Sequence, residues 1–218
     1  MDRGDIMKLL LVGASGLVGS HVLKLALADP RVTHVVAPGR KALAAHAKLE
    51  APICDFSGMT GDEPFWQGGA VICTLGTTIK VAGSQAAFER VDHDYPLTVA
   101  RLMHKRGAQV YVLNSAIGAD ANSRFFYNRV KGRLEQDLAA IGFRSLAFVR
   151  PGLIGGERAE RRRGEGIAEA VLKIAAPVLP KRWRINPAPV IAQSLLDCAL
   201  AAKPGIRIVP SEELTGQV

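Results

Sequence analysis

The run Lys8-Leu-Leu-Leu-Val12 continues directly into Gly13-Ala14-Ser15-Gly16-Leu17-Val18-Gly19, and this stretch decides the fold. The first five residues are apolar enough for a buried strand. The residues after the glycines, 17–28, have a helical pattern that ends at Asp29-Pro30. A strand, a glycine turn and a helix in this order begin a βαβ unit. The stretch therefore predicts an α/β protein.

Short apolar runs alternate with helical stretches along the rest of the chain. Further strands are predicted over 32–37, 52–55, 70–74, 109–113 and 145–149, and further helices over 85–105 and 124–141. Strands that are apolar throughout and separated by helices indicate a parallel sheet covered on both faces. Right-handed crossovers make such a sheet doubly wound. We therefore predict one domain over 1–218, with a doubly wound, mostly parallel Rossmann sheet.

The alternating pattern becomes less regular after Gly152. A charged loop over 157–165, helices over 167–178 and 187–202, and an edge strand over 206–209 are predicted there. Elements within 153–205 are expected to form a small C-terminal cap over the carboxyl edge of the sheet, where ligands bind in such folds. The substrate pocket is then either open or completed by a second subunit in a homodimer.

The composition excludes several classes of protein. Hydrophobic residues make up 48% of the 218 residues and charged residues 22%, which is typical of a globular domain. No apolar run approaches the roughly 20 residues needed to cross a membrane, and the polar start is unlike a secretory signal. A cytoplasmic protein without a membrane partner is expected. The three cysteines, Cys54, Cys73 and Cys198, lack metal-ligand spacing, so no metal site is expected.

The net charge of +8 favours anionic partners. No nucleic-acid-binding motif is visible, so nucleic acid is not expected as a partner. A phosphorylated cofactor and an anionic small-molecule substrate would both use this charge. The basic loop 157–163 carries four arginines and either attracts such a substrate or is a solvated loop paired with its own glutamates.

The glycine turn has the spacing G-x-x-G-x-x-G and predicts a dinucleotide-binding site. Gly13 allows a tight turn, Gly16 lets the backbone approach a pyrophosphate, and Gly19 lets the helix pack closely on the strand. The N-terminus of the helix offers free N–H groups to the phosphates. The predicted contacts are Gly13, Ser15, Gly16, Leu17, Val18 and Gly19.

The end of the second predicted strand favours NADP(H) over NAD(H). An acidic residue there would bind the ribose hydroxyls of NAD. The sequence has Arg40 and Lys41 instead, and an arginine can form a bidentate pair with a 2′-phosphate. The alternative for Arg40 is an ordinary solvated cation.

Two further segments are predicted to border the cofactor. Asp55 ends the third predicted strand and Phe56 follows it, and the Asp55 carboxylate either accepts from the adenine amino group or caps a turn. The small-residue segment Thr74-Leu75-Gly76 follows the fourth predicted strand and either passes under the cofactor or is a simple polar loop.

Tyr127 and Lys131 form the predicted reaction centre. They are four residues apart on a predicted helix, so they share one face. A nearby ammonium lowers the pKa of a phenol, which would suit Tyr127 to proton exchange with a carbonyl or an alcohol. Ser115 follows the fifth predicted strand, where its hydroxyl would hold the substrate oxygen.

Together these features resemble the short-chain dehydrogenase/reductase superfamily, in its atypical NAD(P)-binding branch. Several stretches are most similar to the oxidoreductase family related to the Tat-interacting protein. These are Cys73-Thr-Leu-Gly-Thr-Thr78, Val91-Asp-His-Asp-Tyr95, Ser115-Ala-Ile-Gly-Ala-Asp120, Phe126-Tyr-Asn-Arg-Val-Lys-Gly132 and Arg150-Pro-Gly152.

The resemblance implies an NADPH-dependent carbonyl reductase or alcohol dehydrogenase with Ser115, Tyr127 and Lys131 in the catalytic positions. It also implies that Lys131 holds the nicotinamide ribose and that Pro151, Gly152 and Leu153 border the nicotinamide. Two alternatives stay open: an enzyme like nucleotide-sugar epimerases and dehydratases, and a non-catalytic NADP-binding regulatory or interaction protein.

Overall fold

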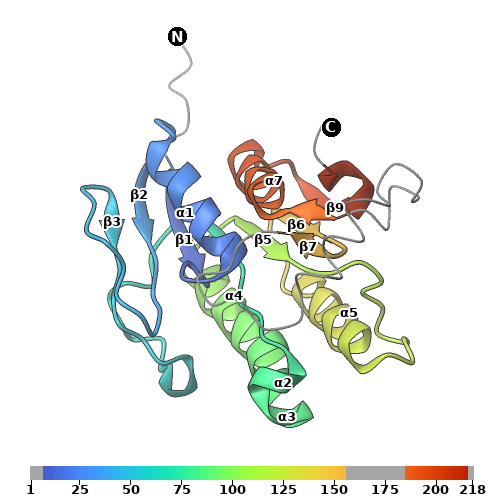
Figure 1. Ribbon diagram of the computed structural model, residues 1–218. Helices are drawn as coiled ribbons and strands as arrows, with labels where there is room; N and C mark the ends of the chain where they lie inside the picture. Colours follow the sequence, from blue (N-terminus) through green and yellow to red (C-terminus); the bar gives the residue numbers. More distant parts are fainter. Residues whose placement is uncertain (1–6, 156–184, 216–218) are drawn as a thin grey trace.

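The computed structural model describes residues 7–155 and 185–215, and its centre is a seven-stranded sheet (Figure 1). The strand order is β3-β2-β1-β4-β5-β6-β9, and every neighbouring pair is parallel. The strands are β1 (Met7–Val12), β2 (Val32–Val36), β3 (Leu49–Glu50), β4 (Ala70–Cys73), β5 (Val110–Asn114), β6 (Ser145–Val149) and β9 (Gly205–Val209). The chain builds outward from β1 first in one direction and then in the other. The prediction of a doubly wound α/β sheet is confirmed.

The third strand differs from its prediction over 52–55. The structure has β3 at Leu49–Glu50 and then a single bridge between Gly39 and Ile53. The Pro52 carbonyl accepts from the Gly39 N–H at 3.1 Å, but a proline has no N–H to donate in return. The pairing between β2 and β3 therefore continues beyond these strands only as a single bridge.

Helices cover both faces of the sheet. Helices α1 (Leu17–Ala28) and α7 (Ala188–Ala201) pack on one face, where Val22 and Ile191 share a buried cluster with Leu9. Helices α4 (Tyr95–Lys105) and α5 (Phe126–Ala139) pack on the other face. Alternate strand residues point to opposite faces. Because helices cover both faces, the side chains on both sides of each central strand are apolar.

The helix predicted over 85–105 consists of three consecutive pieces. Helix α3 (Gln85–Glu89) leads into a π-helical turn, Arg90–Asp94, which leads into α4 without a break. A short helix that the sequence did not predict, α2 (Ile79–Ala82), precedes α3. The π-helical turn adds residues to the turn and so changes which side chains point inward.

The C-terminal part supplies a layer of the fold. Helix α7, which we assigned to the cap from the sequence, covers a sheet face beside α1, because Ile191 and Leu195 are fully buried there. The predicted edge strand is present as β9. A small parallel pair joins β7 (Ile154–Gly155), which follows β6, to β8 (Asn186–Pro187), which precedes α7. The predicted loop 157–165, with its basic segment 157–163, and the predicted helix 167–178 lie outside the described residues.

Within the described ranges, no helix has both the length and the apolar character that a membrane span needs.

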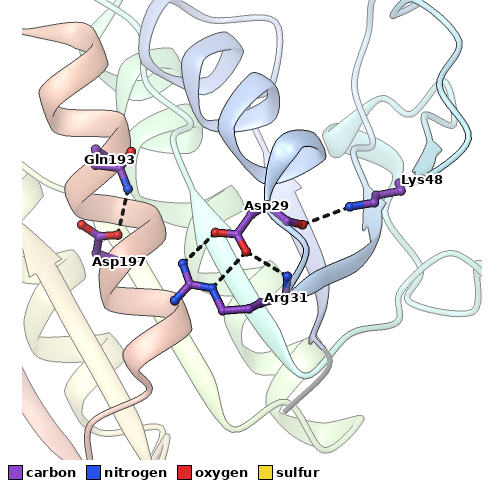
Figure 2. A network of polar contacts seen from close by, with 5 residues as sticks. All are labelled: Asp29, Arg31, Lys48, Gln193 and Asp197. Carbon is purple, nitrogen blue, oxygen red and sulfur yellow. Dashed lines mark hydrogen bonds and ion pairs between the residues drawn. The ribbon is translucent and has the colours of Figure 1, made fainter. Parts of the chain in front are cut away.

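Polar contacts at the amino edge of the sheet hold the end of α1 (Figure 2). The Arg31 guanidinium donates to the Asp29 carboxylate, with Nη2–Oδ2 at 2.7 Å, and the Lys48 ammonium donates to the Asp29 carbonyl at 3.0 Å. On α7, Gln193 donates to Asp197 at 2.8 Å. These contacts lie at the opposite edge from the glycine turn and the loops after β4, β5 and β6.

Candidate active site

The glycine turn between β1 and α1 is held by close backbone contacts. A Cβ on Gly19 would lie 2.1 Å from the Gly13 carbonyl oxygen, and a Cβ on Gly13 would lie 2.7 Å from the Thr74 carbonyl carbon. Gly13 also has φ of +89°, a conformation that glycine adopts at little cost. Helix α1 can therefore begin directly beside β1 and the end of β4.

The start of α1 has the properties of a phosphate-binding site. Its N-cap residue, Gly16, has no side chain, so no side chain caps the N–H groups of the first turn. Ser15 and Gly16 are exposed, whereas Val18 and Gly19 are buried. Uncapped amides and the positive end of the helix dipole both favour an anion. The turn thus fits the pyrophosphate of a dinucleotide.

The residues after β2 and β3 meet in space. Arg40 and Lys41 are exposed beyond β2, and Arg40 lies close enough to Asp55 to contribute to its lowered pKa. The larger cause is Ser57, whose hydroxyl and N–H donate to the Asp55 carboxylate at 2.6 and 3.2 Å. Asp55 therefore caps the 3-10 turn that follows it. Of the two roles left open for Asp55, the geometry shows the capping role.

Phe56, which we predicted to border the cofactor, is buried in the core. Its ring centroid lies 6.1 Å from that of Tyr95, and its side chain is 7% exposed. An aromatic side chain in this position contributes to packing between the sheet and α4.

The loop after β4 is fixed at both ends. The Thr74 hydroxyl donates to the Val12 carbonyl at 3.0 Å, next to the glycine turn. Leu75 packs against the core, Gly76 is exposed, and the Thr77 N–H donates to Asp92 Oδ2 at 2.8 Å. The predicted cofactor segment Thr74–Gly76 therefore connects the glycine turn to Asp92.

Tyr127 and Lys131 lie in the first half of α5, as predicted. Lys131 is 3% exposed, and its Nζ lies 2.8 Å from Oδ1 of Asp92, which is 1% exposed. Tyr127 is 41% exposed, and its ring centroid lies 5.8 Å from that of the buried Phe88. The arrangement is a buried ion pair one helical turn from a partly exposed phenol.

The pKa values differ from the expectation for Tyr127. Burial raises the pKa of its phenol, Lys131 lowers it, and Asp92 raises it again, so the net direction is upward. Lys131 therefore lowers the phenol pKa as predicted, but burial and Asp92 outweigh its effect, so the pKa of Tyr127 is not lowered overall in the protein alone. Burial by itself would lower the pKa of Lys131, but Asp92 and Tyr127 more than offset this, and Lys131 stays charged.

Ser115 lies at the predicted edge but is engaged by another residue. Its N–H donates to the Val149 carbonyl at 2.7 Å, and its hydroxyl donates to Glu135 Oε1 at 2.5 Å. Glu135 also accepts from the Arg150 guanidinium, through Nε at 3.0 Å and through Nη2. The hydroxyl proton is thus directed at a carboxylate. In this arrangement Ser115 does not donate to a ligand.

The segment after β6 is held beside Ser115. The Pro151 carbonyl accepts from the Ile117 N–H at 2.8 Å. The Gly152 N–H donates to Asn186 Oδ1 at 2.6 Å, and the Leu153 carbonyl accepts from the Asn186 N–H at 2.8 Å. The fully buried Asn186 therefore fixes this segment, while the Leu153 side chain is exposed.

The structure brings most of the predicted residues to one edge of the sheet, and it adds three that sequence reasoning missed as site residues. These are Asp92, Glu135 and Asn186. Asp92 lies in the quoted block Val91–Tyr95, but only the π-helical turn shows that it points inward. Glu135 lies four residues after Lys131, which places it on the same helix face. Asn186 gave no signal in the sequence.

The chain is similar to curated fungal proteins over most of its length. It is 34% identical over 217 residues to the mitochondrial protein fmp52 of Aspergillus fumigatus, covering 94% of this chain and 92% of the relative. It is 36% identical over 168 residues to that of Emericella nidulans, covering 72% and 71%. No family model matches the chain. The narrower resemblance to the family related to the Tat-interacting protein stays a prediction.

Solved structures of low sequence identity share the fold. MoeE5 in complex with UDP-glucose and NAD has a TM-score of 0.71 at 14% identity, covering 93% of this chain and 75% of that one. A UDP-N-acetylglucosamine 4-epimerase from Methanobrevibacter ruminantium M1 has a TM-score of 0.71 at 12% identity, covering 94% and 76%. A short-chain dehydrogenase family protein from Francisella tularensis has 0.61 at 15% identity, covering 95% and 98%. These structures and this chain share a Rossmann-type α/β fold.

The names of the curated relatives correct one expectation. We expected a cytoplasmic protein because the polar start is unlike a signal, but the relatives are named as mitochondrial proteins. The polar start argued only against secretion and did not discriminate between intracellular compartments. On the identity and coverage of these relatives, the chain belongs to the Fmp52 family.

Proposed function

We propose that this protein is an NAD(P)-dependent oxidoreductase that reduces a small-molecule carbonyl compound or oxidises the corresponding alcohol. One observation carries the proposal: the partly exposed Tyr127 lies one turn from the buried, charged Lys131 at the carboxyl edge of the sheet. Ligands bind at this edge in open α/β sheets. The NAD complexes among proteins of the same fold support a nicotinamide nucleotide as cofactor.

The residues present fit such a nucleotide. The uncapped start of α1 would hold the pyrophosphate, and the close packing of Gly13 and Gly19 on Thr74 shapes that cradle. The segments Thr74–Gly76 and Pro151–Leu153 would border the rest of it. A bound nicotinamide supplies or accepts the hydride in this chemistry.

The chain's own residues handle the proton. In reduction, the Tyr127 phenol donates its proton to the substrate oxygen as that oxygen becomes a hydroxyl. The Lys131 ammonium then stabilises the resulting phenolate one helical turn away. In oxidation the same proton moves in the opposite direction. The Ser115 hydroxyl donates to Glu135, and Arg150 donates to the same carboxylate. These contacts hold the loop after β5 and the segment after β6 in place beside the reaction centre.

Within this proposal we place NADPH ahead of NADH. Arg40 and Lys41 are exposed beyond β2, where a 2′-phosphate would lie in a Rossmann fold, and both are cations. Titration of the purified protein with NADPH and with NADH, followed by nucleotide fluorescence, tests this preference. Arg40→Ala is expected to weaken NADPH binding by about tenfold or more and NADH binding much less. Arg31→Ala, which removes the same charge at the opposite edge, is the matched control.

Failure to bind either nucleotide would contradict the proposal. If NADPH binds, Tyr127→Phe tests the chemistry on a panel of carbonyl compounds. The phenylalanine ring keeps the packing against Phe88 but has no proton to donate, so turnover is expected to fall about 100-fold or more while NADPH affinity is unchanged. Turnover that persists in Tyr127→Phe would reject the proton role.

Two other functions remain as alternatives with distinct outcomes. A nucleotide-sugar enzyme is favoured by the fold shared with the UDP-N-acetylglucosamine 4-epimerase, and UDP-sugars would then bind and be interconverted. A non-catalytic nucleotide-binding protein would bind NADPH equally well with and without Tyr127 and would turn over no substrate.

A further inference from the structure

The Asp92 carboxylate connects two segments that are distant in sequence. It lies on the π-helical turn Arg90–Asp94, and both of its oxygens are engaged: Oδ1 lies 2.8 Å from Lys131 Nζ, and Oδ2 accepts from the Thr77 N–H at 2.8 Å. The loop after β4 passes close to this carboxylate, since a Cβ on Gly76 would lie 3.4 Å from Oδ1. One buried carboxylate therefore fixes the loop after β4 and the lysine of α5 in a single arrangement.

More exposed polar contacts connect the π-helical turn and the residue before it to α5. Glu89, just before the π-helical turn, pairs with Arg133 of α5. His93 lies between Asp94 and Asp137 of α5, with both nitrogen–oxygen distances 2.9 Å. These side chains are far more exposed than Asp92 and Lys131. They hold the turn on α5 from the outside, and Asp92 holds it from the inside.

The groups that face Lys131 leave its charge balanced. They are Asp92 from the π-helical turn, Tyr127 from α5 and Cys73 from β4. Burial raises the pKa of the Cys73 thiol, which keeps it neutral, and the same holds for Tyr111 beside it. Asp92 is therefore the anion that offsets the ammonium. Asp92 therefore opposes the effect of this ammonium on the Tyr127 phenol.

We propose that Asp92 is a positioning residue of this site, which holds the Lys131 ammonium and the Thr77 backbone together and offsets the charge of that ammonium one helical turn from Tyr127. The proposal rests on the proposed function for the roles of Tyr127 and Lys131. Burial is the main cause of the raised pKa of the Tyr127 phenol, and Asp92 adds to it by opposing Lys131. Nucleotide binding or turnover is not needed to test this.

The test is a pH titration of the tyrosine signals by NMR, with tyrosine labelled at the carbon that bears the hydroxyl. The chain has three tyrosines, and Tyr127→Phe identifies the signal of Tyr127. Asp92→Asn is expected to lower the pKa of Tyr127 by about one pH unit or more, because one close charge has been removed. Asp94→Asn removes the same charge two residues away at the surface and is expected to leave the Tyr127 signal unchanged. An unchanged pKa in folded Asp92→Asn overturns the proposal.

A second comparison covers the case in which Asp92→Asn does not fold. Lys131→Met and the double variant Asp92→Asn/Lys131→Met differ only in the Asp92 charge, and the double variant leaves no unpaired buried ion. The pKa of Tyr127 is expected to be lower in the double variant than in Lys131→Met. Equal values would overturn the proposal.

Hydrogen exchange at the Thr77 amide tests the other half of the inference. Asp92→Ala removes the acceptor, so exchange of this amide is expected to become at least about tenfold faster, whereas Asp94→Ala leaves it unchanged. Unchanged exchange in Asp92→Ala would show that Asp92 does not hold the loop. These outcomes are independent of the proposed function, which fails separately if neither nucleotide binds.

Discussion

Two aspartate ion pairs lie at opposite edges of the same sheet. At the amino edge, Asp29 and Arg31 are 15% and 58% exposed (Figure 2). At the carboxyl edge, Asp92 and Lys131 are 1% and 3% exposed. Water solvates the first pair, so either partner can be lost at little cost. In the second pair, each ion depends on the other for its charge. Among the residues that the structure describes, the most deeply buried ion pair therefore lies where the reaction centre is proposed.

The largest effect is expected when one buried ion is left without its partner. Lys131→Met is expected to lower the free energy of unfolding by about 3–5 kcal/mol, because the Asp92 carboxylate then lies unpaired in the core. Urea denaturation followed by circular dichroism measures the change. A loss as small as that of Arg31→Ala would remove the contrast between the two pairs.

The double variant Asp92→Asn/Lys131→Met sharpens the comparison. With both charges removed, no desolvated ion remains, so the double variant is expected to be more stable than Lys131→Met by about 1–3 kcal/mol. The same denaturation experiment tests this. A double variant less stable than the single one would mean that Asp92 stabilises the fold mainly through Thr77.

The next largest loss of stability is expected at the glycine turn, where Gly19 packs against the Gly13 backbone. Gly19→Ala would place a Cβ 2.1 Å from the Gly13 carbonyl oxygen and is expected to cost about 1–3 kcal/mol of stability. Gly39→Ala is the matched control, because no atom lies within 4 Å of its Cβ position. The melting temperatures of the two variants are compared, and that of Gly19→Ala is expected to be lower. Equal melting temperatures would contradict the close packing of the turn.

Ser115→Ala should have a smaller effect on stability. It removes the donor to Glu135, but Arg150 still pairs with that carboxylate, so a loss of about 1–2 kcal/mol is expected. Calorimetric melting measures it. If the loss instead approached that of Lys131→Met, Glu135 would depend on Ser115 more than on Arg150.

The smallest effect belongs to the amino edge and depends on pH. The pKa of Asp29 is lowered, chiefly because the Arg31 side chain donates to its carboxylate. A lowered folded-state pKa gives stability above the ordinary aspartate pKa of about 4, which is lost as the pH falls below it. Arg31→Ala should therefore be slightly less stable than the wild type at neutral pH, and the difference should vanish in acid. A difference that persists in acid would assign it to packing of the arginine stem.

The fold was largely predictable because its strands are apolar on both faces. The limits of α1 and β6 were predicted to the residue, and those of β1, β4 and β5 within one or two residues. The role of α7 was missed, since an apolar helix near a predicted ligand edge has the same pattern whether it covers a sheet face or a pocket. The interrupted third strand was misplaced because Pro52 conceals the pairing on either side of it.

The candidate site was predictable where it depends on spacing and not where it depends on orientation. Tyr127 and Lys131 are four residues apart, and helix geometry places them together. Asp92 is buried because of a π-helical turn, which no periodicity in the sequence reveals. The position of Ser115 was predictable from the sequence, but the direction of its hydroxyl proton was not, because it depends on Glu135, a residue 20 positions away.

The parallel pairing of β9 with β6, and the packing of α7 beside α1, have a consequence for how the chain is made. The face formed by Leu9, Leu11 and Ile72 is covered in part by α7, which is made after the strands that it covers. During synthesis this apolar face therefore stays uncovered until α7 has been made, and an uncovered apolar face favours aggregation. For the same reason, fragments 1–155 and 185–218 made separately are candidates for complementation, with the second fragment completing the fold of the first.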